Sequence, residues 1–312
     1  MLPVRFDVLV NGGAGSVDAA EEERELAAIE AAFVAAGAEA AVRVVDPAQM
    51  QHEVRACWDA PDRPRAVVVA GGDGTVSCAA GAAAGTDIVL GALPLGTFNH
   101  FAKDIEVPVD LGAAVASLVG GEVRAIDAAE VNGRVFVNNS VLGLYPDLVA
   151  VRDRIRDQRG WGKVRAVPVA LVAVLRRFPV HRLDLRGPGY ERRRVRTPLV
   201  FVGNGVFGNE DGGRPHRDDL ADGFLGVAVS RAKSRWGLLR SAVRALARGA
   251  EADDDIDTVA LTELTVDLHV RHVRVAVDGE ICWMDAPLRY RILPKALQVL
   301  APPADDPPDD AR

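Results

Sequence analysis

Two hydrophobic periodicities alternate along the first third of the chain. Short, almost purely apolar runs are typical of strands buried on both faces, and the stretches between them repeat apolar residues at helical spacing. The runs predict strands at residues 5–10, 41–45, 66–70 and 88–93. The intervening pattern predicts helices before Gly37, at residues 48–59, after Thr75 and at residues 111–119. This alternation indicates a mostly parallel sheet covered on both faces, which is a three-layer α/β domain.

The pattern changes after Gly120-Gly121. A strand, the turn pair Asn132-Gly133 and another strand follow, which is a strong hairpin signal. Further strands are expected at residues 199–202, 225–229, 264–270 and 273–277, with helices at about 162–178 and 234–249. The second part of the chain is therefore predicted to be mainly antiparallel β.

These patterns predict the domain boundaries. We expect an α/β domain at residues 1–124 and a β-rich domain at residues 125–301, whose last strand can return to the first domain. The length of 312 residues, about twice the usual domain size, agrees with two domains. Residues 302–312 are rich in Pro and Asp and predict a disordered tail.

Composition narrows the class of partner and the compartment. Acidic residues exceed basic ones, 44 against 37, so the net charge of -7 gives no electrostatic reason for binding nucleic acid. The three cysteines form no C-x-x-C pair and predict neither a disulfide framework nor a zinc site. No apolar stretch approaches the ~18 residues of a spanning helix. We therefore expect a cytoplasmic protein with, at most, peripheral contact to the inner face of the membrane.

The sharpest local signal is Gly71-Gly72-Asp73-Gly74-Thr75, directly after a predicted strand and before a predicted helix. Glycines there let backbone N–H groups surround phosphate oxygens, and a helix N-terminus favours an anion. The Asp73 carboxylate would repel phosphate unless a metal ion or a hydroxyl lies between them, which indicates metal-linked or acid–base chemistry. The alternative is a turn in which Asp73 only caps the helix.

A second candidate loop follows the next predicted strand. Residues 94–103 include Thr97 and Asn99, which offer a hydroxyl and an amide at a helix start, and His100, which contacts either a ligand or solvent. Loops at successive strand ends of an open α/β sheet are expected to face one crevice. Neither the Walker-type phosphate loop nor the dinucleotide fingerprint occurs in the sequence.

Six motifs occur in a fixed order along nearly the whole chain: Asn11 to Gly15, Gly71 to Thr75, Pro94 to Lys103, Asn204-Gly205, Asp222 to Leu225 and Asp278 to Glu280. In this set the sequence resembles the diacylglycerol kinase catalytic-domain family, which includes bacterial lipid kinases and sphingosine kinases. Gly-Gly-Asp-Gly-Thr alone would also suit NAD kinases and phosphofructokinases, from which residues 96–103 separate the chain. Gly12 departs from the family's usual Pro, and residues 16–18 lack the basic residue often found after that loop.

The resemblance implies a lipid kinase that transfers the γ-phosphate of ATP, with Mg²⁺, to a hydroxyl of a lipid alcohol such as diacylglycerol. It implies that ATP is bound by Asn11, Gly15, Gly71, Gly72, Asp73, Gly74, Thr75, Gly96, Thr97 and Asn99. On this basis we assign Asp278 as the general base, with Asp73 and Glu280 acting on the phosphates through Mg²⁺ or water. The alternative for residues 278–280 is a plain hairpin turn.

An acidic cluster and a basic helix leave further alternatives open. Asp218, Asp219 and Asp222 either hold a structural divalent cation or form a solvated loop. The predicted helix at residues 234–249 carries arginines every four residues, which suits an anionic membrane, or it packs on the β domain. Alternative functions are a kinase for NAD or another small acceptor and a catalytically inactive lipid-binding relative. A homodimer is one alternative for the oligomeric state.

Overall fold

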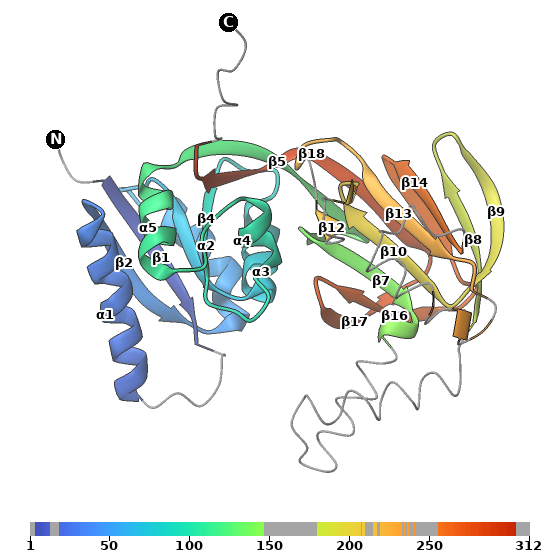
Figure 1. Cartoon of the computed structure of the whole chain (residues 1–312), viewed down its shortest axis with the longest axis horizontal. Coiled ribbons are helices and arrows are strands. Elements are labelled where there is room, and N and C mark those ends of the chain that lie inside the picture. The colour runs from blue at the N-terminus through green and yellow to red at the C-terminus, as the bar shows by residue number, and fades with distance from the viewer. Residues whose placement is uncertain are drawn as a thin grey trace, which may run out of the picture. The chain divides into compact units, whose positions relative to one another are not determined.

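The computed structural model of the 312-residue chain describes residues 4–12, 19–146, 180–206, 208–209, 215–216, 219–232, 234, 236–237, 240 and 255–303. Two compact units make up the chain (Figure 1). Unit 1 consists of Met1–Ile126 and Lys295–Arg312, and unit 2 consists of Asp127–Pro294.

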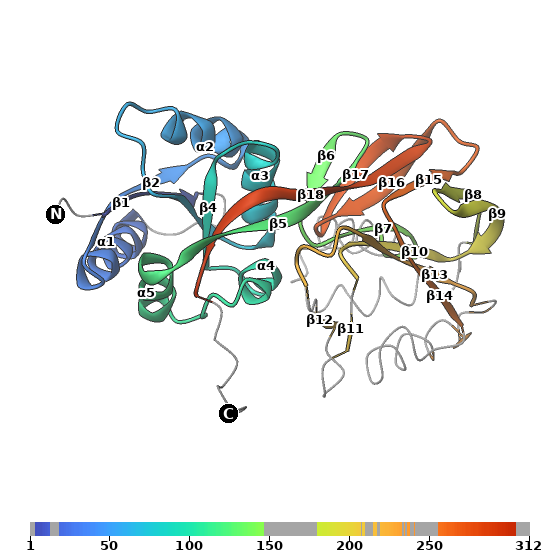
Figure 2. The same ribbon diagram turned by 90° about the horizontal axis from the view of Figure 1, so that it is seen from above.

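Unit 1 is built around a parallel sheet with the strand order β2-β1-β3-β4-β18. The strands are β1 (Val4–Asn11), β2 (Ala38–Val45), β3 (Val67–Gly71), β4 (Val89–Pro94) and the last residues of β18 (Leu288–Ala301). The helices are α1 (Ala19–Ala35), α2 (Met50–Trp58), α3 (Asp73–Ala83), α4 (His100–Asp104) and α5 (Leu111–Gly120), with a 3₁₀ turn at Pro47–Gln49. Figure 2 shows α1 and α5 on one face of the sheet and α2 and α3 on the other, which confirms the three-layer α/β prediction.

Apolar strands explain why this sheet is covered on both faces. Phe6, Val8 and Leu9 of β1 are completely buried, and so are residues 67–69 of β3. A strand with one wet face would alternate apolar and polar residues, whereas these runs do not. The Phe6 and Phe33 ring centroids lie 5.1 Å apart, so the aromatic pair packs α1 on β1.

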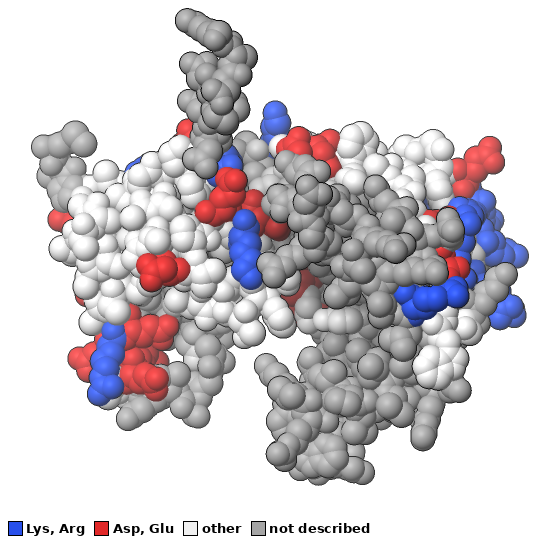
Figure 3. Space-filling model, viewed as in Figure 1, with Lys and Arg blue, Asp and Glu red and all other residues white. Residues whose placement is uncertain are grey.

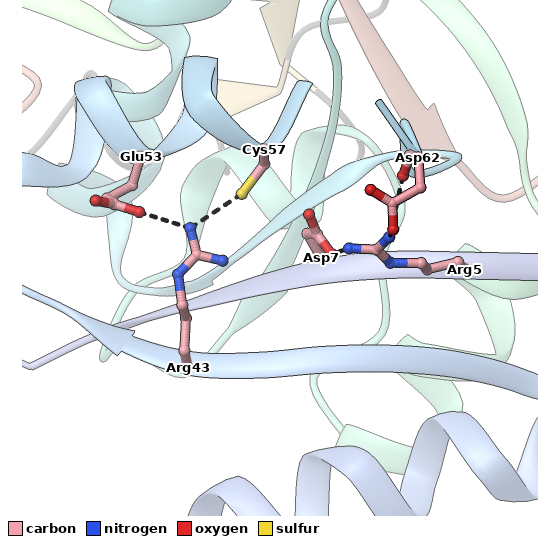
Figure 4. Close-up of polar contacts among 6 residues, drawn as sticks. All are labelled: Arg5, Asp7, Arg43, Glu53, Cys57 and Asp62. Atoms are coloured by element: carbon pink, nitrogen blue, oxygen red, sulfur yellow. Dashed lines mark hydrogen bonds and ion pairs between the residues drawn. The ribbon is translucent and has the colours of Figure 1, made fainter. Parts of the chain in front are cut away.

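Two polar groups join strands of unit 1 to neighbouring segments (Figure 4). Arg43 of β2 donates to Glu53 at 2.6 Å and to the Cys57 thiol at 3.2 Å, both on α2. Burial raises the pKa of Cys57, so the thiol stays protonated at neutral pH. The second group consists of Arg5, Asp7 and Asp62. The Arg43 contacts hold α2 beside the edge strand of the sheet.

The helix in the Gly-Gly-Asp-Gly-Thr motif begins earlier than predicted. α3 starts at Asp73 with Gly72 as its N-cap, so Asp73, Gly74 and Thr75 form the first turn. Thr75 donates its N–H to the Gly72 carbonyl at 2.9 Å, which closes that turn. The sequence prediction was wrong because Gly and Asp are typical loop residues. Glycine is also a tolerated N-cap, and an acidic residue is favourable in a first helical turn.

Unit 2 contains two large antiparallel sheets and the two-stranded sheet of β11 and β12. One has the order β14-β13-β10-β7-β16-β17, and the other runs β18-β15-β8-β9, with β5 paired to β18 and β6 paired to β5. The strands are β5 (Glu122–Val131), β6 (Arg134–Phe136), β7 (Asn139–Gly143), β8 (His181–Gly187), β9 (Tyr190–Thr197), β10 (Leu199–Asn204), β11 (Gly208–Asn209), β12 (Pro215–His216), β13 (Leu225–Ser230), β14 (Ile256–Leu261), β15 (Glu263–Asp267), β16 (His272–Val277) and β17 (Glu280–Asp285). Buried residues from both sheets, including Leu183, Val200, Leu225, Val266 and Val275, form one core. The antiparallel β prediction is confirmed.

The sequence predicted one hairpin turn correctly and one strand too long. Asn132 and Gly133 join β5 to β6 with φ values of 48° and 83°, as a two-residue hairpin turn with positive φ at both positions requires. The strand predicted at residues 264–270 ends at Asp267, because the chain turns at His269, whose φ is 56°.

Several predicted segments lie outside the described residues. These are residues 162–178, most of residues 234–249 and residues 304–312. Within the part of the chain that the structure describes, no helix is both long enough and apolar enough to cross a membrane.

β18 takes part in two sets of pairings along its length. Leu288 to Arg291 pair antiparallel with β15, whereas Gln298 and Val299 pair parallel with β4. The change of unit falls between these two sets, at Lys295, where φ is 51°. The end of the chain thus supplies a strand to the sheet that the start of the chain begins.

Candidate functional site

The parallel sheet of unit 1 reverses its strand order between β1 and β3. From β1 the chain passes to β2 on one side, whereas from β3 it passes to β4 on the other. Ligands of open α/β sheets bind outside the carboxyl ends of the strands at such a reversal. Asn11 ends β1 and Gly71 ends β3, so two of the predicted phosphate-binding motifs start at this point.

A side-chain hydrogen bond joins these two strand ends. Asn11 Nδ2 donates to Thr75 Oγ1 at 2.8 Å. Thr75 is buried, and a Cβ at residue 71 would come within 2.5 Å of its hydroxyl oxygen, so glycine is required there. The fold therefore brings the first two motifs together.

The loop after β4 lies directly against the loop after β3. Phe101 donates its backbone N–H to Asp73 Oδ1 at 3.2 Å. A Cβ at Gly96 would overlap the Cα of Gly72, so the two backbones are in contact. This close approach explains the glycines in both motifs and brings the two loops together, as the sequence predicts.

Asn99 shapes its own loop. Its Oδ1 accepts the Gly96 N–H at 2.9 Å, while its Nδ2 donates to the carbonyls of Gly96 at 2.9 Å and Pro94 at 3.1 Å. The residue is 5% exposed and has a left-handed backbone with φ of 53°, which asparagine tolerates better than most residues. Thr97 is exposed. Contact of either residue with a nucleotide stays a prediction.

Two exposed rings follow Thr97 in the same loop. Phe98 is 65% exposed, and its ring is nearly parallel to the exposed His100 ring, with 5.8 Å between the centroids. This arrangement leaves His100 accessible to solvent and to a ligand alike.

The loop after β1 explains the departure at Gly12. The Gly12 N–H donates to the Val45 carbonyl at 3.1 Å, a bond that proline cannot make. A Cβ at this residue would also lie 2.7 Å from Val44 Cγ1. Gly15 lies outside the described residues.

The Asp278-Gly279-Glu280 motif contains the turn between β16 and β17. Asp278 and Gly279 have φ values of 46° and 82°, so the backbone is the hairpin turn considered as the alternative. The carboxylate nevertheless does more than close a turn. Its Oδ2 accepts the N–H of Val137, and its Oδ1 accepts those of Asn138 and Asn139, each at 2.9 Å. Asp278 is 8% exposed and organises the backbone between β6 and β7.

Asn204 holds the same stretch of backbone from another side. Its N–H donates to the Asn138 carbonyl at 2.9 Å, and its Nδ2 donates to the carbonyls of Val137 and Asp127, each at 3.0 Å. Asp127, itself buried, accepts the Gly223 N–H at 2.7 Å. Two motifs that are far apart in the sequence therefore converge on residues 137–139 of unit 2, and a third bonds to the neighbouring Asp127.

Glu280, two residues after Asp278 in the chain, lies at the surface. Its Oε2 accepts from Arg134 at 2.6 Å, and its side chain is 61% exposed. Unlike the Asp278 carboxylate, the Glu280 carboxylate lies where an incoming molecule can reach it.

The predicted acidic cluster consists mainly of turn residues. Asp222 accepts the N–H groups of Val206 and Phe224, each at 2.8 Å, and Asp219 accepts that of Ala221 at 2.7 Å. Asp218 lies outside the described residues. Within the described ranges, no group of three or more His, Cys, Asp or Glu side chains converges as a metal site.

Comparison with known proteins decides the family of this chain. Residues 5–131 match the family described as diacylglycerol kinase catalytic domain. A protein named diacylglycerol kinase from Mycobacterium tuberculosis is 32% identical over 251 residues, which cover 76% of this chain and 77% of that protein. The chain belongs to the diacylglycerol kinase catalytic-domain family. The resemblance found in the sequence is thereby confirmed, and the chain is a kinase of this family.

Further similarities to known proteins extend over the rest of this chain. Residues 149–301 match the YegS C-terminal NAD kinase beta sandwich-like domain. A protein named probable lipid kinase YegS-like from Pseudomonas syringae pv. tomato is 30% identical, over 80% of this chain and 84% of that protein. A solved structure of a diacylglycerol kinase from Bacillus anthracis str. Sterne superimposes with a TM-score of 0.68 at 19% identity, over 97% of this chain and 99% of that one. That structure supports the fold alone.

Sequence reasoning missed the residues that Asp278 and Asn204 hold in place. Asp127, Arg134 and residues 137–139 belong to none of the recognised motifs. Asn138-Asn139 interrupts the apolar run from Val135 to Leu142, which marks an unusual position but does not reveal its partners. Asn138 is buried, and its backbone N–H and carbonyl, which require partners there, bond to Asp278 and Asn204.

Proposed function

We propose that this kinase transfers the γ-phosphate of ATP to a hydroxyl group of a lipid alcohol, with diacylglycerol as the first candidate. The names of its relatives support a lipid acceptor. The observation that carries the proposal is the contact of Gly72 with Gly96 at the reversal of the sheet, with the Asp73 carboxylate beside it. Such a site offers backbone N–H groups and a carboxylate, which together suit a nucleoside triphosphate with a divalent cation.

The phosphates are assigned to the N-terminus of α3. The backbone N–H groups of Asp73 and Gly74 open the first turn of α3, where N–H groups lack an intrahelical acceptor and attract anions, whereas the N–H of Thr75 donates to the Gly72 carbonyl. Gly72 and Gly74 carry no side chain that would keep phosphate oxygens away from this backbone. The Asn11–Thr75 hydrogen bond fixes the β1 loop beside the same helix start.

The residues present fit Mg²⁺ held together with the nucleotide. Mg²⁺ usually keeps several waters and takes one or two carboxylates besides the substrate phosphates. Asp73 provides a carboxylate at the helix start that would repel phosphate if no cation lay between them, and Phe101 orients it through Oδ1. Bound there, Mg²⁺ would neutralise charge on the phosphoryl group. We assign Asp73 to hold the ion.

The acceptor hydroxyl needs a base, and the contacts favour Glu280 over Asp278. Three backbone N–H groups donate to the buried Asp278 carboxylate, whereas Glu280 is exposed and oriented by Arg134. We therefore propose Glu280 as the general base and Asp278 as the positioning residue, which revises the assignment made from the sequence. The hydroxyl oxygen bonds to the γ-phosphorus, the bond from that phosphorus to the bridging oxygen breaks, ADP leaves, and Glu280 takes the hydroxyl proton.

A small acceptor such as NAD is the second candidate. It is favoured by the match of residues 149–301 to a domain described as NAD kinase beta sandwich-like. The segment at residues 96–103 and the names of the relatives favour the lipid. The inactive alternative is opposed by the presence of Asp73, Asp278 and Glu280.

The proposal is tested by phosphate transfer from γ-³²P-ATP with Mg²⁺ to diacylglycerol, a sphingoid base and an isoprenoid alcohol in neutral mixed micelles, and to NAD. We expect label on a lipid. The kcat of Glu280→Gln should fall about 10²- to 10⁴-fold, the usual contribution of a positioned general base. Glu191→Gln, an exposed acidic residue on β9, serves as the matched control and should keep wild-type activity.

The outcomes separate acceptor from mechanism. Label on NAD with none on lipid would refute the lipid acceptor and leave the kinase site intact. A pH profile in which Glu280→Gln loses the acidic limb, while Asp278→Asn keeps it at a lower rate, supports the division of roles. The reverse pattern would return the base assignment to Asp278.

A further inference from the structure

Arginines are concentrated on one face of a sheet in unit 2. We call this the arginine face, and its members are Arg182 and Arg186 of β8, Arg192, Arg194 and Arg196 of β9, and Arg289 and Arg291 of β18. All seven residues are exposed, whereas the alternate residues Leu183 and Leu185 are buried in the core on the other face. Figure 3 shows Lys and Arg gathering at the edge of the molecule where β8 and β9 lie.

Strand register places like charges next to one another on this face. Arg182 lies directly opposite Arg196 in the β8–β9 pair. In the next two pairs, Arg186 lies opposite Thr265, and Thr265 lies opposite Arg289. Like charges that face each other across neighbouring strands destabilise a sheet, so this arrangement opposes stability in the absence of an anion.

The acidic residues on the face neutralise only part of this charge. The buried Asp184 carboxylate pairs with Arg192 and Arg194, and these ion pairs, led by the hydrogen bond from Arg192, lower the pKa of Asp184 to about 2. Arg291 donates to Glu130 at 2.6 Å. Across the described ranges, no carboxylate pairs with the remaining four arginines: Arg182, Arg186, Arg196 and Arg289.

We propose that the arginine face binds the surface of a bilayer rich in anionic phospholipid. The inference rests on the proposed function, because a lipid alcohol is presented in such a bilayer. Guanidinium groups pair with phosphate in a bidentate manner, and each basic residue near an anionic surface adds to the binding free energy. The four unpaired arginines extend over neighbouring strands of one sheet rather than line a groove, which suits an extended surface.

A nucleic acid is the less suitable polyanion. The net charge of the chain is -7, so the rest of the molecule opposes a long polyanion that passes beyond this face. Proteins that bind single strands also provide aromatic side chains for base stacking. Among the described residues of this face the ring of His269 lies against Asp184, with 3.2 Å between Nε2 and Oδ2, and a single ring does not form a row of stacking side chains.

Vesicle co-sedimentation of the full chain tests the proposal. Vesicles of phosphatidylcholine alone are compared with vesicles that contain about 30% phosphatidylglycerol, at low and at physiological salt. The test variant is Arg182→Gln/Arg196→Gln, and the control is Arg24→Glu on α1, which changes the net charge by the same amount at an exposed residue of unit 1. Melting temperatures of both variants are measured alongside, as a check on folding.

We expect wild type and Arg24→Glu to bind the anionic vesicles in a salt-dependent manner. The double variant should bind roughly 30-fold more weakly, about fivefold for each arginine. In neutral micelles its kcat and KM for the lipid should remain those of wild type. Equal binding by the double variant and Arg24→Glu, or equal binding to neutral and anionic vesicles, would overturn the proposal.

Two further results keep the two proposals separate. If no lipid is phosphorylated in micelles or vesicles but vesicle binding depends on Arg182 and Arg196, the kinase substrate is wrong and the docking surface stands. If a fluorescent duplex oligonucleotide binds in a way that the double variant abolishes, while vesicle binding is unchanged, the face binds nucleic acid and the bilayer proposal fails.

Discussion

The two units use different chemistry to hold their motifs in place. In unit 1 the loops approach because side chains are absent: Gly71 makes room for Thr75, and Gly72 lies against Gly96. In unit 2 buried polar side chains do the work, since Asp278 and Asn204 hold residues 137–139 through backbone hydrogen bonds. Motif residues in the first unit leave the backbone open for a ligand, whereas motif residues in the second are largely used within the protein.

This difference changes how a motif residue should be interpreted. An aspartate in a motif invites a catalytic role, yet Asp278 is buried and accepts three backbone N–H groups. Its exposed neighbour Glu280 is better placed to act on a substrate. We therefore expect substitutions to act differently in two places. One is the glycine-built site, which comprises Gly71, Gly72, Asp73 and Gly96, and the other is the carboxylate-built site around Asp278.

Within unit 1, the largest effect is expected for Asp73→Asn. Asparagine keeps an oxygen that can accept the Phe101 N–H, so the fold should be retained while the charge that holds Mg²⁺ is lost. We expect kcat to fall about 10²- to 10³-fold with an unchanged melting temperature, measured at saturating Mg²⁺. Glu122→Gln, an exposed acidic residue of the same unit, is the control. A kcat of Asp73→Asn equal to that of wild type would show that the Asp73 carboxylate does not hold Mg²⁺ in the reaction.

Gly96→Ala should damage the glycine-built site through the backbone. The new Cβ would overlap the Gly72 Cα, and relief of that clash should lower the free energy of unfolding by about 1–3 kcal/mol and raise KM for ATP. Gly120→Ala is the matched control, because no atom lies within 4 Å of its Cβ position. Urea denaturation compares the two variants. Equal free energies of unfolding for the two variants would show that Gly96 is not required for the close contact of the loops.

Asp278→Asn should damage unit 2 through stability. The amide end of asparagine would face a backbone N–H of residues 137–139, which leaves a buried donor unpaired at a cost of about 1–3 kcal/mol. Asp285→Asn, whose carboxylate is 80% exposed, is the control. Urea denaturation measures both. Loss of activity without loss of stability would make Asp278 a reacting group after all.

A smaller effect is expected where unit 1 does use a side chain. Asn11→Ala removes the hydrogen bond to Thr75 and should lower the free energy of unfolding by about 0.5–1.5 kcal/mol. Combining Asn11→Ala with Thr75→Val in a double-mutant cycle isolates the pair, and we expect the two losses to be less than additive. Strict additivity would show that the two side chains do not act together.

The effect at Asp184 depends on pH, because the pKa of its carboxyl is lowered to about 2, first by the hydrogen bond from Arg192. A carboxyl with a depressed folded pKa stabilises the protein above its unfolded pKa, ~3.9, and loses that contribution as pH falls to the folded value. The melting temperature of wild type should therefore exceed that of Asp184→Asn at neutral pH. The gap should narrow between about pH 4 and pH 2. A difference in melting temperature that does not change with pH would mean that the charge of Asp184 does not contribute to stability.

The sequence predicted what depends on neighbouring residues and missed what depends on distant ones. The α/β alternation, the Asn132-Gly133 turn and the antiparallel character of the second domain all follow from local patterns. The hydrogen bond between Asp278 and Asn138 spans 140 residues, so no local pattern could reveal it. Likewise, the basic run in β9 was visible in the sequence, but only strand register places Arg182 opposite Arg196.

The site was predictable to a similar extent. Glycine motifs at strand ends identified the loops that meet at Gly72 and Gly96, because glycines that directly follow buried strands indicate close backbone approach. The start of α3 was placed too late, since the propensity of Gly and Asp for loops gave way to capping. The Asn99 side chain bonds within its own loop, and this depends on a left-handed φ that the sequence does not reveal.

The pairing of β18 with β4 also determines the order in which the molecule can be completed. During synthesis the first four strands of the parallel sheet emerge early, whereas Gln298 and Val299, which cover the free edge of β4, come after all of Asp127–Pro294. At ~5–20 residues per second the interval is on the order of ten seconds or more. For that time β4 is an edge strand with unpaired backbone groups, which is where a nascent chain is most open to pairing with the wrong partner.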